Sequence, residues 1–273
     1  MVKKIGLKRA LVTRVLPHGG RLFNARRRNI VYNIFISILV GIALFGLSML
    51  SPLMHWGFAL FIAFVGLFAT AMLLTRKTMK NIQPVFMQAQ KQAQARQFQL
   101  AIKTLESLRP LAKWQLLLGS QIDSQIGVFL YADRKEEDAV AHLQKGSARS
   151  ADSQMILASI YYRRSDLAKM KEVMDVTLKF NKKNPLVYNA YAFMLFNKED
   201  GPGAMAILSR GLKAVPGNEA TQENLTKVQN GKKLSMKAFG MNWYSLQLEK
   251  PPMSMMQDQF SGRAGFRQQK KRK

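Results

Sequence analysis

The chain has 273 residues, a formal net charge of +26 and no cysteine. This length allows one or two domains with a sizeable core, and the missing cysteine excludes disulfides, iron–sulfur clusters, thiolate zinc sites and cysteine nucleophiles. The charge favours an anionic partner, either a membrane surface or a nucleic acid.

The basic residues are concentrated at the two ends of the chain. Residues 1–29 hold nine Lys or Arg and no acid, whereas residues 232–273 hold ten basic residues and two acids. Residues 81–231 are only mildly positive, with 20 basic and 14 acidic residues. We therefore predict a basic cytoplasmic segment over 1–29 and a basic, flexible tail over 231–273.

Two long runs without a charged residue follow the basic N-terminal segment. Ile30 to Leu50 is 21 residues long and Trp56 to Leu74 is 19, and a helix of either length matches a hydrocarbon core of about 30 Å. Pro52 lies between them, where it favours a turn. The sequence predicts two transmembrane helices, 30–50 and 56–74, that form an antiparallel hairpin within residues 30–75.

Three other interpretations of these runs are a buried helix pair in a soluble protein, a cleaved signal peptide and a mitochondrial transit peptide. A signal peptide has an apolar core of only about 7–15 residues. Small residues spaced four apart in each run would let two membrane helices approach closely; they are Ser37, Gly41, Ala59 and Ala63. The membrane hairpin is the interpretation that we favour.

Basic residues flank both outer ends of the predicted hairpin, whereas its turn holds only His55. The flanking residues are Arg26, Arg27, Arg28, Arg76, Lys77 and Lys80. The positive-inside rule predicts that both chain ends lie on the cytoplasmic side. We expect an integral protein of a bacterial inner membrane, since the two-span anchor is compact, with anionic lipid as a partner.

Residues 82–230 carry apolar residues at helical spacing, and no part of this region alternates as a strand would. The clearest unit is "NPLVYNAYAFMLFNKEDGPGAMAILSRGLKAVPGN", in which the key positions are Tyr188, Ala192, Leu195, Ala204, Leu208 and Pro216. This unit resembles the tetratricopeptide repeat, whose small residues let two helices pack closely.

Weaker copies of the unit place small residues at 89, 127 and 158, before the one at 192. The resemblance implies an all-α fold, in which an α-solenoid of about four helix pairs over 82–217 ends in a capping helix over 218–230. The alternative is a generic helical bundle without stacking of the pairs.

No arrangement of residues in the sequence indicates catalysis. His18, His55 and His142 are far apart, and no phosphate-binding loop is present. The resemblance to tetratricopeptide repeats implies protein binding, so we expect no enzymatic activity, no cofactor and no metal. In tetratricopeptide domains, ligands bind along the first helix of each pair. The corresponding residues of this sequence are Tyr131, Met155, Tyr162, Asn189, Phe193 and Phe196.

We expect these six side chains either to form a groove for an extended peptide or partner helix, or to be packed by a neighbouring helix. The predicted function is a membrane-anchored scaffold for protein–protein interaction at the cytoplasmic face. Two alternatives stay open: a basic membrane protein that tethers nucleic acid, with Phe260 and Phe266 stacking bases, and a non-catalytic subunit of an envelope assembly.

Overall fold

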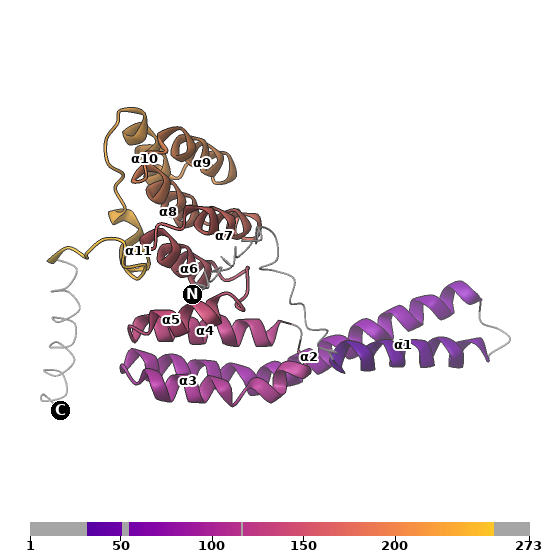
Figure 1. Ribbon diagram of the computed structural model, residues 1–273. Coiled ribbons are helices and arrows are strands. Elements are labelled where there is room, and N and C mark those ends of the chain that lie inside the picture. The colour runs from indigo at the N-terminus through magenta and orange to yellow at the C-terminus, as the bar shows by residue number, and fades with distance from the viewer. Residues whose placement is uncertain (1–31, 51–54, 116, 254–273) are drawn as a thin grey trace, which may run out of the picture.

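The computed structural model describes residues 32–50, 55–115 and 117–253. Every regular element in these ranges is a helix, which confirms the predicted all-α class for this part of the chain. An apolar hairpin projects from a stack of shorter helices, and the stack ends in a segment that folds back over it (Figure 1). The predicted 1–29 segment lies outside the described residues.

The apolar hairpin consists of α1 (Tyr32–Met49) and the first half of α2 (Trp56–Gln94). Both helices are long and apolar enough to cross a membrane, and only 17% and 6% of their most apolar windows are buried. A core helix pair of a soluble protein would instead be mostly buried. The hairpin therefore exposes a wide apolar surface that water does not favour.

Helix α2 does not stop at the end of the apolar run. Its 39 residues continue past Arg76 and Lys77 into the helical stack, although Pro84 lies inside the helix. A proline removes one backbone hydrogen bond, and here it does not end the helix. We had placed the end of the hairpin at 75 and the start of the array at 82, whereas one helix joins the two regions.

Four helical hairpins form the stack. The second half of α2 pairs with α3 (Phe98–Glu106), α4 (Leu118–Ala132) with α5 (Glu136–Leu143), α6 (Ala151–Arg163) with α7 (Leu167–Phe180), and α8 (Pro185–Phe196) with α9 (Gly201–Ala214). Consecutive hairpins also contact each other, and α10 (Glu219–Gln229) packs on the last one. The predicted number of helix pairs and the predicted terminal helix agree with this arrangement.

The same turn closes all four hairpins. The amide of the last turn residue donates to the carbonyl five residues earlier, from Gln97, Lys135, Asp166 and Asp200 to residues 92, 130, 161 and 195. One residue in each turn has a positive φ: Arg96, Arg134, Ser165 and Glu199. This is the hydrogen-bond pattern of a Schellman helix end, so the four hairpins share backbone geometry as well as order.

Small residues lie where the helices of a pair cross. Ala192 on α8 and Ala204 on α9 are fully buried, as the repeat pattern predicts. A Cβ atom added to Gly127 on α4 would lie 2.7 Å from Cγ of Leu143 on α5. Each close approach lets large residues on both sides fill the seam.

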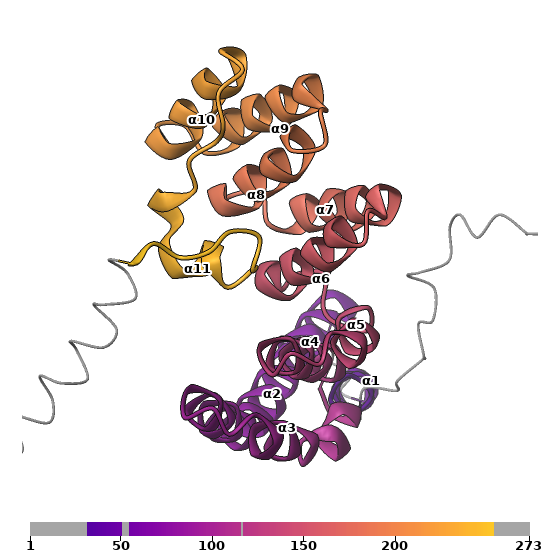
Figure 2. The same ribbon diagram turned by 60° about the vertical axis from the view of Figure 1, so that its left-hand side comes forward.

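The predicted tail over 231–273 is wrong for its first part. Leu234, Met236, Trp243, Tyr244 and Leu246 are buried in the core of the array. Their burial holds residues 234–248, including α11 (Gly240–Tyr244), against the helices of the stack. Figure 2 shows α11 beside the α6 and α8 region. Residues 254–273, with Phe260 and Phe266, lie outside the described residues.

Candidate interaction site

The six residues predicted to line a groove lie on α4, α6 and α8, but they do not surround an open space. Met155 and Asn189 are buried in the core, as are Tyr131 and Phe193. Tyr162 and Phe196 are half-buried, and the Lys198 ammonium lies 5.3 Å from the centroid of the Tyr162 ring. The second of our two interpretations therefore describes the four buried side chains, because these are packed by the chain itself.

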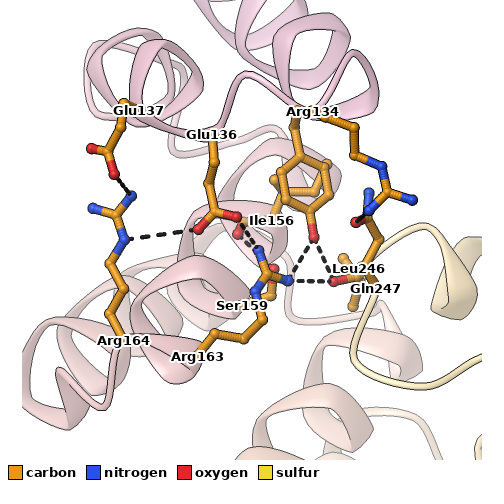
Figure 3. Close-up of polar contacts among 10 residues, drawn as sticks. Arg134, Glu136, Glu137, Ile156, Ser159, Arg163, Arg164, Leu246 and Gln247 are labelled. Carbon is orange, nitrogen blue, oxygen red and sulfur yellow. Dashed lines mark hydrogen bonds and ion pairs between the residues drawn. The ribbon is translucent and has the colours of Figure 1, made fainter.

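Tyr131 on α4 binds the backbone of the C-terminal segment. Its hydroxyl donates to the Leu246 carbonyl at 2.7 Å and accepts from Nη1 of Arg163 on α6 at 2.9 Å. Arg134 donates to Oε1 of Gln247 at 3.0 Å, which adds a second link to the same turn (Figure 3). These bonds connect two helices of the array to one loop of the C-terminal segment.

Phe193 on α8 packs against Trp243 of α11. Their ring centroids are 4.7 Å apart in an edge-to-face arrangement, which adds to the apolar burial of both rings. Trp243 is fully buried, and its indole N–H donates to Oε2 of Glu249 at 2.7 Å. Trp243, the largest side chain in this segment, thus has its apolar surface buried and its polar atom hydrogen-bonded.

A buried amide network ties the start of the same segment to the end of the array. Asn189 donates to the Thr221 hydroxyl at 2.8 Å and accepts from Asn224 at 2.9 Å. The Asn224 side chain bonds both the N–H and the carbonyl of Ser235, at 2.7 and 3.0 Å. Asn189 therefore has a structural partner inside the protein.

Residues 234–248 thus fill the face that we expected to bind a partner. The sequence "MKAFGMNWYSLQLEK" carries apolar residues that favour packing, although it lies in the part of the chain that we predicted to be a flexible tail. The structure instead takes it back to α4, α6 and α8, since Leu246 and Trp243 contact residues on all three helices. This long-range return has no local sequence pattern that would predict it.

Ion pairs cover the edge of the array formed by the turns within the hairpins. Glu136 and Glu137 at the start of α5 pair with Arg163 at 2.9 Å and with Arg164 at 2.7 Å (Figure 3). Further pairs join Asp133 to Lys135, Asp166 to Lys169 and Asp200 to Lys171. The bonds from these lysines lower the pKa of all three aspartates.

The two helices of the apolar hairpin approach closely along the predicted small residues. Ser37 and Ala59 are buried, and a Cβ atom added to Gly41 would lie 3.2 Å from Cβ of Leu67. The hydroxyl of Ser37 donates to its own helix, at the Asn33 carbonyl 2.7 Å away. The Ser37 hydroxyl is thus satisfied within its own helix, which is what a bilayer would require of a polar group in the seam.

Three of the predicted membrane-flanking basic residues are described by the structure. Arg76, Lys77 and Lys80 are exposed on α2, just beyond the apolar run. Arg26, Arg27 and Arg28 lie outside the described residues. Two contacts fix the base of the hairpin to the array: the Tyr32 and Trp114 rings, with centroids 5.1 Å apart, and a 3.3 Å bond from Gln115 Nε2 to Met79 Sδ.

The described residues define a class of architecture, in which an apolar hairpin of membrane length leads directly into an array of helical hairpins. Within 32–50, 55–115 and 117–253, no group of three or more His, Asp or Glu side chains is arranged to hold a metal. Comparison of the chain with models of protein families, with curated proteins and with solved structures found no match.

Proposed function

We propose that the protein is a membrane-anchored scaffold whose helical array, similar to tetratricopeptide repeats, binds another protein at the cytoplasmic face of a bacterial inner membrane. The apolar hairpin crosses the bilayer, and both ends of the chain lie on the cytoplasmic side. The exposed Arg76, Lys77 and Lys80 beyond the apolar run support this orientation.

The observation that carries the proposal is the continuity of α2. One helix supplies both an apolar run of membrane length and the first helix of the array. A rigid connection of this kind holds a binding surface at a fixed distance from the bilayer, which a scaffold needs and a flexible linker does not provide.

The repeated turn supports the similarity to tetratricopeptide repeats. Four consecutive hairpins end their first helix with the same hydrogen bond and a residue of positive φ. Repeat arrays of this type bind proteins on the surface made by successive hairpins. Residues 234–248 pack on the face formed by the first helix of each hairpin. We therefore assign the partner-binding surface to the outer face of the array, which the second helices of the hairpins form.

Membrane insertion is tested by extraction of membranes with alkaline carbonate, and orientation by protease added outside intact cells. We expect the protein to stay in the membrane and its C-terminal region to resist digestion. Release by carbonate would contradict insertion, and external digestion of the array would contradict the cytoplasmic orientation.

Protein binding is tested by purification from native membranes in mild detergent, followed by mass spectrometry. A scaffold predicts a protein that is recovered in a fixed ratio with this chain. A partner that never dissociates would instead indicate a subunit of an envelope assembly. Recovery of the chain alone, under conditions that preserve known membrane complexes, would contradict both.

Tethering of nucleic acid is the second candidate, and the net charge of +26 favours it. Electrostatic binding to nucleic acid weakens steeply as salt increases, because each neutralised phosphate releases counterions. Retention of RNA or DNA by the detergent-solubilised full chain at physiological salt would support this candidate. Lack of retention would leave the protein scaffold as the function.

A further inference from the structure

The alternating direction of the helices sorts the loops of the array into two edges. Contacting helices joined by three or four residues must run antiparallel, so the turns within the hairpins lie at the opposite edge from the loops between them. We call the loops between hairpins, 107–117, 144–150, 181–184 and 215–218, the proximal edge. The turns within hairpins, 95–97, 133–135, 164–166 and 197–200, form the distal edge.

The proximal edge lies on the side of the array from which the apolar hairpin projects. Helix α2 enters the array from the hairpin and ends at the distal edge, so α3 must return toward the hairpin. The loop after α3 reaches the base of the apolar hairpin, where Trp114 contacts Tyr32 and Gln115 contacts Met79. The later hairpins repeat this alternation, so α5, α7 and α9 also run from the distal edge to the proximal edge.

The two edges differ in charge. The four proximal loops hold six basic residues and no acid: Arg109, Lys113, Lys145, Arg149, Lys182 and Lys183. The four distal turns hold five basic and four acidic residues. The helix turns that flank the proximal loops do not cancel the difference, since Lys103, Lys179 and Lys213 balance Glu106, Asp152 and Glu219.

The two edges also differ in how their charges are paired. Three of the distal acids, Asp133, Asp166 and Asp200, pair with lysines. On the proximal edge, Arg109 pairs with Asp123. The other five cations are exposed, and none of them takes part in an ion pair between described residues. The positive charge of the proximal edge is therefore open to an external anion.

Exposed aromatic side chains accompany these cations. Trp114 in the first proximal loop is 42% exposed, and Phe180, the last residue of α7 before the third loop, is 54% exposed. Aromatic rings favour the boundary between headgroups and acyl chains, and Lys and Arg beside them favour anionic headgroups. The proximal edge combines both kinds of residue.

We propose that the proximal edge docks on the anionic lipid headgroups of the leaflet from which the hairpin emerges. This inference rests on the proposed insertion of the hairpin, because insertion brings the edge to the bilayer surface. A lipid surface fits better than a nucleic acid, since the bilayer that holds the hairpin already faces this edge. The array then lies along the membrane, and its distal edge faces the cytoplasm.

The test uses the full chain in nanodiscs and takes advantage of its lack of cysteine. A fluorophore is attached at Pro216→Cys, an exposed and uncharged position in the last proximal loop, and in a second protein at the exposed distal position Asn197→Cys. Quenching by a headgroup-attached quencher is compared between phosphatidylcholine alone and its mixture with phosphatidylglycerol. Carbonate extraction of the same samples reports insertion separately.

We expect roughly twofold or greater quenching at position 216 when phosphatidylglycerol is present, and no change at 197. This difference in quenching between the two lipid compositions disappears at about 1 M salt, where the Debye length is about 3 Å. The variant Lys182→Glu with Lys183→Glu lowers the ratio of docked to undocked protein by at least about 25-fold, counting about fivefold for each of the two lysine charges that are lost. The matched variant, Lys91→Glu with Arg96→Glu, changes two exposed cations, one in the last turn of α2 and one in the distal turn that follows, and leaves docking intact.

Equal quenching at 216 in the two lipids, with the chain still inserted, overturns the docking proposal alone. Release of the chain by carbonate overturns insertion and docking together. A response at 216 to added RNA instead of to phosphatidylglycerol makes this edge a nucleic-acid surface and also overturns lipid docking. Far-UV circular dichroism confirms that each charge variant is folded, and the salt dependence of the unmodified chain tests docking without any charge variant.

Discussion

At the scale of single residues, Tyr131 shows how one polar group holds a long-range contact. Its hydroxyl lies between the Leu246 carbonyl and the Arg163 guanidinium, and the residue is buried. A buried carbonyl that loses its donor keeps the cost of its lost hydration. The hydroxyl therefore stabilises the return of the C-terminal segment more than an exposed hydrogen bond would.

Replacement of Tyr131 by Phe tests this role. We expect a loss of about 1–2 kcal/mol in the free energy of unfolding of the array, because the Leu246 carbonyl is left with only the 3.4 Å contact to Arg163. The measurement is the melting temperature of the detergent-solubilised protein. Tyr162→Phe is the control, since the ring of Tyr162 contacts Lys198 through its face. Equal effects of the two changes would contradict the prediction.

Asp200 combines a helix cap with an ion pair. It accepts from the Gly203 amide at the start of α9 and pairs with Lys171 at 3.0 Å. The bond from Lys171 is the largest cause of its lowered pKa. A carboxylate whose pKa is lower in the folded state stabilises the protein above its unfolded pKa of about 3.9, and this contribution is lost as pH falls through the folded value.

The variant Asp200→Asn keeps an oxygen for the cap and removes the charge. At pH 7 we expect a small loss, at most about 1 kcal/mol, because the ion pair is partly exposed. The difference between the two proteins should shrink as pH falls below about 4 and vanish below the folded pKa. Melting temperatures from neutral to acidic pH provide the measurement. A difference that grows as pH falls would contradict the assigned direction of the pKa shift.

At the scale of elements, the seam of the apolar hairpin depends on how closely α1 and α2 approach. A side chain at position 41 would meet the Cβ of Leu67 and the carbonyl of Ala63, at 3.2 and 3.4 Å from its Cβ. The backbone carbonyl cannot move aside as the end of a side chain can. Association of apolar helices in lipid relies on this kind of contact, since burial from water does not drive it there.

We therefore expect Gly41→Val to weaken the hairpin by about 1–3 kcal/mol, the usual cost of overpacking. Gly46→Val on the same helix is the matched control, because nothing lies within 4 Å of its added Cβ atom. Both changes replace a glycine of α1 by valine, so the effect of helix propensity is the same in the two variants and cancels when they are compared. Melting temperature in detergent is the measurement, and equal melting temperatures would show that the seam does not depend on Gly41.

Periodic apolar residues predicted the helices after the hairpin, two uncharged runs predicted the apolar hairpin, and the resemblance to tetratricopeptide repeats predicted the helix pairs. Tyr188, Ala192, Ala204 and Leu208 are all buried where the repeat pattern expects contact. The backbone geometry of the turns was harder to predict. The four residues with positive φ are Arg96, Arg134, Ser165 and Glu199, and none of them is a glycine. Backbone bonds to the preceding helix hold these turns, and such bonds leave little trace in side-chain type.

The candidate site was predicted less well than the fold, and Phe193 shows the reason. Its position on the first helix of a pair was predicted, but its contact with Trp243 joins residues 50 positions apart. Helical spacing reports only neighbours three or four residues away. Trp243 lies in the part of the chain that we predicted to be a flexible tail, so neither its burial nor the helices that bury it were predicted.

At the scale of the whole molecule, α2 decides how the array is held relative to the apolar hairpin. Its 39 residues run from Trp56 to Gln94 without a break, and the contacts of Trp114 and Gln115 strengthen the joint. A continuous helix resists bending far better than a flexible linker of equal length. The proposed orientation of the proximal edge toward the bilayer depends on this stiffness.

Insertion of Gly-Ser-Gly-Ser after Lys80 should release the array from the hairpin while both stay folded. A spin label at Asn197→Cys, measured in nanodiscs of phosphatidylcholine at high salt, should then become more mobile, because the flexible insert removes the rigid connection and charge no longer holds the edge. Insertion of four alanines at the same point adds about one helical turn and keeps the helix continuous. The label should stay as immobile in the alanine protein as in the unmodified one. If both insertions increased mobility equally, the contacts at Trp114 and Gln115 would hold the array, and α2 would not.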